Sequence, residues 1–276
     1  MKKIGFVDYY ISEWHANNYP QWIKEACEKL NADYKVAYAW AELDISPVDG
    51  VSTDEWCEKF GAERCKNLSE LCEKSDFIVI LAPSNPEKHL LYAETVLKYG
   101  KRTYIDKTFA PDLATCEKIF ALGEKYGTPF FSSSALGYAD ELDALSNVNT
   151  MITTGGGSNL PEYIIHQAEM VVKKLGVGAS EVNAEWKGTQ CFIDVKYENG
   201  KRATMIYGKS MPFSIYMSNG EKEIWKRADS PFFNNLIEDI VRFFGDGIPS
   251  FDGSRTKEVI KLCEMAIAAA NKQETN

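Results

Sequence analysis

The chain has 276 residues, 45% of them hydrophobic, a size that suits one large domain or two domains of ordinary size. Its 31 basic and 40 acidic side chains give a net charge of −9, which disfavours nucleic acid as a partner because the phosphate backbone is also negative. No run of about 18 apolar residues occurs, and the apolar stretch near the start is too short for a signal peptide. We therefore expect a cytoplasmic protein with a small-molecule substrate.

The seven cysteines include no C-x-x-C pair, and the chain has only three histidines. Cysteines in a chain without a secretion signal are expected to be reduced thiols. A structural zinc site needs four clustered cysteine or histidine ligands, so we expect no bound metal.

In the first half of the chain, short apolar runs alternate with amphipathic helical patterns. The expected strands cover residues 4–7, 35–39, 77–82, 103–105 and 129–132. The expected helices cover residues 21–30, 53–60, 68–73, 86–99 and 111–126, and Pro20 indicates a first helix that begins late. This alternation predicts βαβ units and a doubly wound parallel sheet. We assign residues 1–134 to a Rossmann-like nucleotide-binding domain.

The second half has a different pattern. A strand is expected over residues 148–153, and helices over 160–175, 232–244 and 254–271. Asn199-Gly200 and Asn219-Gly220 predict two β-hairpins, because a type I′ turn needs positive φ at both central residues. We assign residues 135–276 to a smaller α+β domain with a mostly antiparallel sheet, expected to bind substrate and to support a homodimer or tetramer.

Four segments, in order along the chain, are similar to motifs of one enzyme family. Residues 77–89 resemble that family's fourth strand and the helix after it, and residues 100–108 (G-K-R-T-Y-I-D-K-T) resemble its G-K-h-V-…-E-K-P strand. Residues 162–169 (E-Y-I-I-H-Q-A-E) resemble its D-x-x-x-H-x-x-D helix, and residues 232–253 resemble its C-terminal helix and D-G turn. Together they resemble the Gfo/Idh/MocA oxidoreductases over nearly the whole chain.

The resemblance implies an enzyme that uses NAD or NADP to move a hydride to or from a secondary hydroxyl or ketone of a sugar- or polyol-like substrate. The family's E-K-P lysine and helix histidine flank the substrate carbon, and they correspond here to Lys107 and His166. His166 would be the general acid/base, and Lys107 would stabilise the developing alkoxide. Glu162 or Glu169 would orient the histidine, although Glu162 is equally open to a capping box with Asn159 at the helix start. Glu169 would also contact the substrate, and Asp106 would lie with the cofactor.

The turn after the first strand lacks the G-x-G-x-x-G sequence of dinucleotide-binding domains, since no glycine occurs between Gly5 and Gly50. A dinucleotide would then depend on backbone amides and other side chains, with Glu42 or Asp44 at the ribose. The other residues expected at the cofactor are Asp8, Tyr9, Tyr10, Ser12, Ser84, Asn85 and His89, the last of which is equally open to a structural role.

A second hypothesis starts from the same turn, where Asp8 and Glu13 would repel a pyrophosphate. Trp14 and His15, among further rings and amides, would suit a sugar or polyol, because rings stack on C–H faces and amides pair with hydroxyls. The chain would then be a non-redox relative: a carbohydrate-binding or regulatory protein, or an enzyme that uses no nicotinamide. It also remains open that these rings simply pack between sheet and helix.

Overall fold

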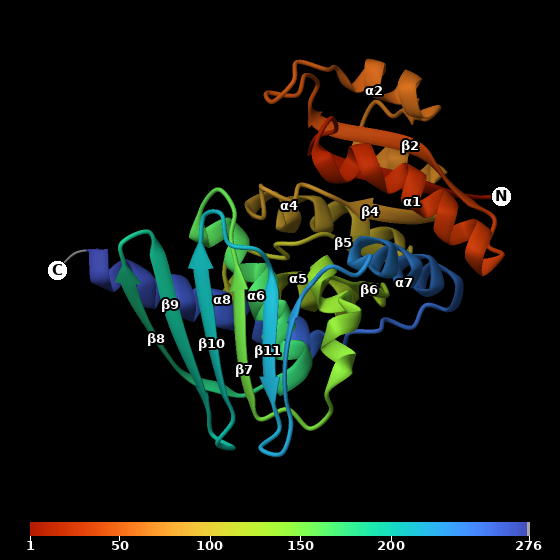
Figure 1. The fold of residues 1–276 in the computed structure, drawn as a ribbon. Helices are drawn as coiled ribbons and strands as arrows, with labels where there is room; N and C mark the ends of the chain where they lie inside the picture. The colour runs from red at the N-terminus through yellow and green to blue at the C-terminus, as the bar shows by residue number, and fades with distance from the viewer. Residues whose placement is uncertain (275–276) are drawn as a thin grey trace. The chain divides into compact units, whose positions relative to one another are not determined.

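The structure is a computed structural model that describes residues 1–274, and the chain divides into two compact units. The first unit consists of residues 1–133 and 236–252 (Figure 1). The second consists of residues 134–235 together with the chain from residue 253 onward. The assignment of all residues from 135 onward to one domain is therefore wrong for 236–252, for a reason given below.

The first unit contains a six-stranded sheet with the order β3-β2-β1-β4-β5-β6, and every neighbouring pair in it is parallel. Its strands are β1 (Lys2–Tyr10), β2 (Tyr34–Leu43), β3 (Glu63–Arg64), β4 (Phe77–Ile80), β5 (Thr103–Ile105) and β6 (Phe130–Phe131). Because the strand order runs outward from β1 in both directions, the sheet is doubly wound, and the predicted Rossmann-like fold is confirmed.

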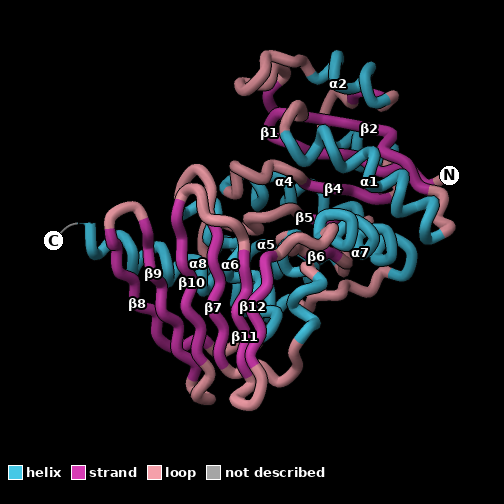
Figure 2. Tube along the Cα trace, in the orientation of Figure 1, coloured by secondary structure: helices cyan, strands magenta, loops and turns pink. Residues whose placement is uncertain are grey.

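The first unit's described residues contain six α-helices and one short 3-10 helix. Figure 2 draws the helices in cyan. They are α1 (Trp14–Leu30), α2 (Thr53–Phe60), α3 (Leu68–Lys74), α4 (Glu87–Val96), η1 (Leu97–Tyr99), α5 (Leu113–Tyr126) and α7 (Phe232–Asp246), the last of which enters the unit at residue 236.

The first helix begins earlier than the sequence predicted. Glu13 is the N-cap of α1, and Pro20 lies inside the helix. The predicted late start is wrong because the Glu13 cap fixes where the helix begins, and the helix continues through Pro20 despite the hydrogen bond that a proline removes and the crowding of its ring. The helix then buries Tyr19 and Ile23 on its inner face.

Helix α7 belongs with the first sheet because its aromatic side chains pack there. The ring of Phe244 stacks on Phe77 with centroids 4.7 Å apart, and Phe243 meets Phe131 edge-on at 4.9 Å. Arg102 donates a hydrogen bond of 2.7 Å to the carbonyl oxygen of Gly245. These contacts make residues 236–252 part of the first unit's core.

The second unit contains a six-stranded sheet with the order β12-β11-β7-β10-β9-β8. All its pairs are antiparallel except β7–β10, and both predicted hairpins are present, between β9 and β10 and between β11 and β12. The expected type I′ turn is wrong, because φ is positive at Gly200 and Gly220 but not at Asn199 or Asn219. Helices α6 and α8 cover one face of this sheet (Figure 1). The elements are η2 (Ala135–Tyr138), η3 (Asp140–Ala144), β7 (Thr150–Gly155), α6 (Leu160–Leu175), β8 (Ala179–Lys187), β9 (Gln190–Tyr197), β10 (Arg202–Gly208), β11 (Ser214–Ser218), β12 (Glu223–Arg227) and α8 (Gly253–Glu274).

Within residues 1–274, no helix combines the length and the apolar character that crossing a membrane requires.

The inner strand β1 carries a buried carboxyl group two residues before its end. Asp8 is 1% exposed, and its Oδ1 accepts hydrogen bonds from the amides of Tyr9 (2.7 Å) and Ala82 (3.0 Å). Its Oδ2 is buried without a hydrogen-bond partner among the described residues. Burial, reinforced by the negative charge of Glu13, raises the pKa of Asp8 well above its usual value.

This burial predicts that Asp8→Asn stabilises the protein at about pH 8 and that the gain shrinks toward about pH 4. A carboxyl group with a raised pKa binds its proton more tightly in the folded state, so folding loses stability as pH rises from the unfolded pKa toward the folded one. Asparagine keeps the Oδ1 acceptor and carries no charge. Urea unfolding at both pH values tests this, with the exposed Asp143→Asn as the control. An equal change in unfolding free energy at both pH values would contradict the prediction.

Candidate functional site

A buried carboxylate, Asp106, lies directly after β5 and gathers polar groups around it. Its Oδ1 accepts hydrogen bonds from the Lys107 amide (2.8 Å) and the Tyr104 hydroxyl (3.3 Å), and its Oδ2 pairs with Nδ1 of His15. The hydroxyl of Tyr19 lies 3.3 Å from the same His15 nitrogen. Burial acts to raise the pKa of Asp106, but His15 and Lys107 outweigh it and lower that pKa, so this carboxyl is ionised.

Lys107 is held beside this carboxylate. Its side chain is buried, and its Nζ donates a hydrogen bond of 3.2 Å to the carbonyl oxygen of Pro83, in the loop after β4. The peptide bond between Lys107 and Thr108 is cis. The ammonium group therefore lies at the carboxyl edge of the parallel sheet, where open α/β sheets bind their ligands.

The N-terminus of α1 is capped by an acidic side chain. The carboxylate of Glu13 accepts hydrogen bonds from the amides of His15 (2.7 Å) and Ala16. Burial raises the pKa of Glu13, opposed by His15 and by these two amides. Free amides at a helix start are the groups that such a fold offers to a phosphate. Here an anion from the chain itself already binds them.

The other first-turn residues expected at the cofactor are engaged within the chain. Ser12 donates a hydrogen bond of 2.7 Å to Asp49, and the rings of Tyr9 and Tyr10 meet edge-on at 5.9 Å. The ammonium of Lys88 lies 4.6 Å from the centre of the Tyr9 ring.

The two candidate ribose acids are paired as well. Glu42 binds Lys88 at 2.6 Å and accepts a hydrogen bond from Tyr92 at 2.8 Å. Asp44 forms an ion pair with Arg64 at 2.8 Å. A ribose hydroxyl would have to share the Glu42 carboxylate with two existing partners.

His89 is a core residue in this structure, which favours its structural role over a place at the cofactor. It is fully buried, with Nδ1 lying 3.0 Å from the carbonyl oxygen of Phe109 and Nε2 lying 2.5 Å from that of Leu81. Burial lowers its pKa. Ser84 and Asn85 were also predicted to lie at the cofactor. Ser84 is exposed, and Asn85 donates a hydrogen bond of 3.0 Å to Glu87.

Trp14 and His15, predicted to touch substrate, differ in their surroundings. Trp14 is 54% exposed, and its ring meets those of His15 and Trp22 edge-on at 5.3 and 5.6 Å. His15 is buried and stacks on Tyr19 with centroids 5.2 Å apart. Only Trp14 therefore offers an accessible ring face, and His15 belongs to the Asp106 network.

In the second unit, His166 on α6 is held by a serine that sequence reasoning did not select. Nδ1 of His166 lies 2.7 Å from Oγ of Ser134, and the Ser134 amide donates a hydrogen bond of 3.2 Å to the buried carboxylate of Glu169. Of the two acids expected to orient the histidine, Glu169 is the one in this chain of contacts. Ser134 and His166 are 32 residues apart, so no local spacing could have paired them.

Two aromatic rings flank this histidine, and glycines make room for them. The rings of Tyr163 and Phe213 lie 5.7 and 5.5 Å from the imidazole. A Cβ atom on Gly157 would lie 2.1 Å from the Tyr163 ring, and one on Gly155 would lie 2.4 Å from that of Phe213. The glycine run after β7 thus serves the packing around His166.

Glu162 serves the start of α6. Its amide donates a hydrogen bond of 2.9 Å to Asn159, and its carboxylate accepts from Ser158 (3.0 Å) and from the Asn159 side chain (3.1 Å). This arrangement is a helix cap, which supports the capping role over the catalytic one.

Among the described residues, no group of three or more histidine, cysteine, aspartate or glutamate side chains is placed to hold a metal ion.

The first turn does not fit a dinucleotide as folded here. A pyrophosphate at the start of α1 needs open amides, yet Glu13 binds those of His15 and Ala16, and Asp8 adds a second carboxyl group nearby. Since like charges at short range repel, the pyrophosphate and the Glu13 carboxylate cannot share this position.

Comparison with known proteins supports the fold and the family. Residues 44–133 match the GFO_IDH_MocA family, described as an oxidoreductase family with an NAD-binding Rossmann fold. The matched segment begins after the first turn, so it covers β3 to β6 and leaves Asp8 and Glu13 outside. No curated protein sequence matches the chain.

Solved structures resemble the chain over nearly its full length at low sequence identity, which establishes the fold alone. UDP-N-acetylglucosamine 3-dehydrogenase GnnA from Acidithiobacillus ferrooxidans has a TM-score of 0.78 at 12% identity, covering 98% of each chain. GenD2 from gentamicin A biosynthesis, in complex with NAD, has a TM-score of 0.77 at 13% identity, covering 98% of this chain and 95% of that one. Biliverdin reductase from Synechocystis, in complex with biliverdin and NADP+, has a TM-score of 0.69 at 14% identity, covering 98% and 99%.

The expected cofactor class, NAD or NADP, agrees with the description of the matched family. Residues 44–133 thus match the Gfo/Idh/MocA oxidoreductase family, and the fold of both units is similar to that of solved dehydrogenases, while the first turn lacks the glycine fingerprint.

Proposed function

We propose that this protein is an oxidoreductase that interconverts a secondary hydroxyl and a ketone on a sugar- or polyol-like substrate, with NAD or NADP as the hydride carrier. The observation that carries the proposal is the positioning of His166 by Ser134, itself bound to Glu169. A similar fold in a protein named UDP-N-acetylglucosamine 3-dehydrogenase supports the choice of a sugar-like substrate.

In this proposal His166 moves the hydroxyl proton. Oxidation of an alcohol requires a base for that proton, and an imidazole changes charge near neutral pH. The contact with Ser134 fixes the position of Nδ1, and the Tyr163 and Phe213 rings restrict the imidazole from the sides. Glu169 acts through Ser134 as a positioning residue.

Lys107 stabilises the charge on the reacting oxygen. An ammonium group placed before the reaction stabilises an alkoxide without reorganising solvent. The buried Asp106 carboxylate binds the Lys107 amide, and the Pro83 carbonyl binds its Nζ, so this side chain is ordered before substrate arrives.

The direct test is calorimetric titration of purified protein with NAD+, NADH, NADP+ and NADPH, followed by a polyol and sugar screen for formation of reduced nicotinamide. Turnover of any such substrate supports the proposal. Binding of sugars with no nicotinamide turnover, at any nucleotide concentration, would reject it.

A second candidate function is favoured by one observation, the capping of α1 by Glu13. If no dinucleotide ever displaces that side chain, the protein is a non-redox relative that binds a carbohydrate. Titration with sugars in the absence of nucleotide separates the two, with the fluorescence of the exposed Trp14 ring as the reporter.

His166→Ala should lower kcat by about two to four orders of magnitude, the usual contribution of general acid–base catalysis. Ser134→Ala should lower kcat less and shift the pH profile, because the serine acts through the histidine. Lys173→Ala, on the same helix, is the control. A His166→Ala enzyme with near-normal kcat would remove this residue from the mechanism.

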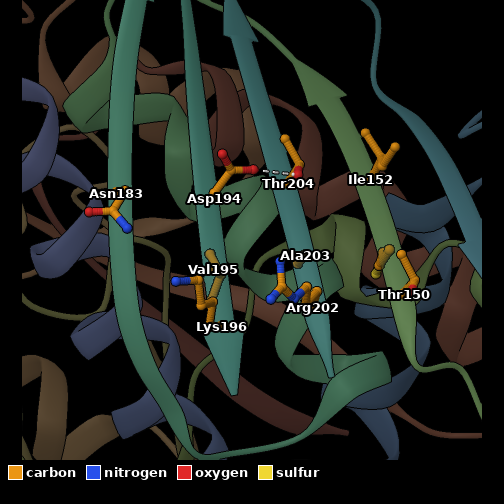
Figure 3. A pocket seen from close by; sticks show the side chains of 10 residues that line it. Thr150, Ile152, Asn183, Asp194, Val195, Lys196, Arg202, Ala203 and Thr204 are labelled. Atoms are coloured by element: carbon orange, nitrogen blue, oxygen red, sulfur yellow. Dashed lines mark hydrogen bonds between the residues drawn. The ribbon is translucent and has the colours of Figure 1, made fainter. Parts of the chain in front are cut away.

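We propose that the second unit binds the second unit of another copy of this chain. Helices cover one face of its sheet, and a row of side chains crosses the other face through neighbouring strands: Trp225, Tyr216, Ile152, Thr204 and Asp194. Figure 3 shows part of this face, where Thr204 donates a hydrogen bond of 2.6 Å to Asp194 beside a hollow of about 320 Å³. Trp225 is 60% exposed. Apolar and aromatic side chains beside the acidic Asp194 and the basic Lys196 and Arg202 of the hollow suit a two-fold interface between identical sheets.

If this face joins two copies, Ile152→Glu should convert the assembly to a monomer, because a two-fold axis buries the new charge twice. Light scattering after size exclusion measures the mass, with the exposed Val177→Glu as the control. A wild-type chain that is monomeric at all concentrations would contradict the assembly.

A further inference from the structure

The first turn keeps the spacing of the dinucleotide fingerprint while replacing its glycines. In G-x-G-x-x-G the glycines follow the first strand and open the first helix. When the last position is placed on the N-cap of α1, the three positions fall on Asp8, Tyr10 and Glu13. Asp8 and Tyr10 lie within the last three residues of β1, and Glu13 is the N-cap of α1, so two acids and an aromatic residue occupy the three positions where the fingerprint has glycine.

Glu13 makes the contacts that a phosphate would make there. Its two carboxylate oxygens accept from two successive amides, those of His15 and Ala16, at the first turn of a helix of 17 residues. A helix start favours any anion through these amides and its dipole. The carboxylate is covalently attached to the helix it caps, so its local concentration is fixed and high.

Asp8 provides an independent observation at the same position. Its Oδ2 is buried and has no hydrogen-bond partner among residues 1–274, although the side chain is only 1% exposed. An uncompensated buried carboxyl oxygen disfavours a second negative group beside it. Two carboxyl groups thus already lie at this end of β1 and at the start of α1 before any ligand binds.

We propose that Glu13 determines cofactor binding in this protein: its carboxylate occupies the place of the cofactor's pyrophosphate, and a dinucleotide binds only when this side chain leaves the helix start. The inference rests on the proposed function, since it concerns the cofactor of that reaction. With Glu13 at the helix start, the ligand class that is excluded is the dinucleotide.

The experiment is calorimetric titration of NADH and NADPH into the full chain and three variants. Glu13→Gly frees the amides and removes the charge, and should tighten binding by about tenfold or more. Glu13→Gln keeps an acceptor oxygen without the charge, so its affinity for the dinucleotides should lie between those of wild type and Glu13→Gly. Asp112→Gly removes an acidic N-cap from α5 in the same unit, and should bind as wild type. Glycine is an accepted N-cap residue, and thermal unfolding of each variant verifies folding.

Three further outcomes are distinguishable. Equal affinity of wild type and Glu13→Gly would overturn the inference and leave the cofactor of the proposed function intact. Binding by Glu13→Gly alone, with none by wild type at any concentration, would support the inference while rejecting the redox function. No binding by any variant, including Glu13→Gly combined with Asp8→Gly, would overturn both.

Discussion

The buried charge of Asp106 constrains the first unit more than any other group. An ionised carboxylate removed from water costs several kcal/mol unless it is paired and hydrogen-bonded. Here the compensation comes from His15 on α1, from Tyr104 on β5 and from the amide of Lys107. Because these partners lie on different elements, satisfying one charge fixes the helix against the sheet edge and orders the lysine.

Three acids at this edge are accommodated in three different ways. Asp106 has a cationic neighbour and stays ionised, whereas Asp8 has only two amides on one oxygen and holds its proton more tightly. Glu13 uses the partial positive charge of a helix start. Pyrophosphate loops normally keep that charge for a ligand, whereas here a carboxylate of the chain itself occupies the helix start within an unchanged fold.

Much of this fold followed from the sequence because apolar periodicity and turn chemistry are local signals. The parallel strands, the helix over residues 160–175 and both Asn-Gly hairpins were predicted, and the structure has them. The start of α1 was missed because glutamate is not a preferred N-cap residue, so its capping gave no signal. The amphipathic pattern of α7 showed that one face is buried but not which sheet covers it.

The candidate site was less predictable, since its contacts join residues distant in sequence. Family motifs selected His166, Lys107 and Asp106, yet nothing in the spacing pointed to Ser134, which holds the histidine. His89 could not be assigned from sequence, because a core histidine and a cleft histidine have the same flanking pattern. Its two carbonyl contacts come from Leu81 and Phe109, on separate loops.

The membership of α7 in the first unit has a consequence for biosynthesis. The first unit is discontinuous, with residues 134–235 inserted between its two parts. On the ribosome, the parallel sheet emerges first but lacks the Phe243 and Phe244 rings that cover Phe131 and Phe77 until the inserted sheet has been translated. The nascent chain must therefore keep an apolar face of its first unit uncovered during that interval, and a chain truncated at residue 133 would lack the segment that completes its core.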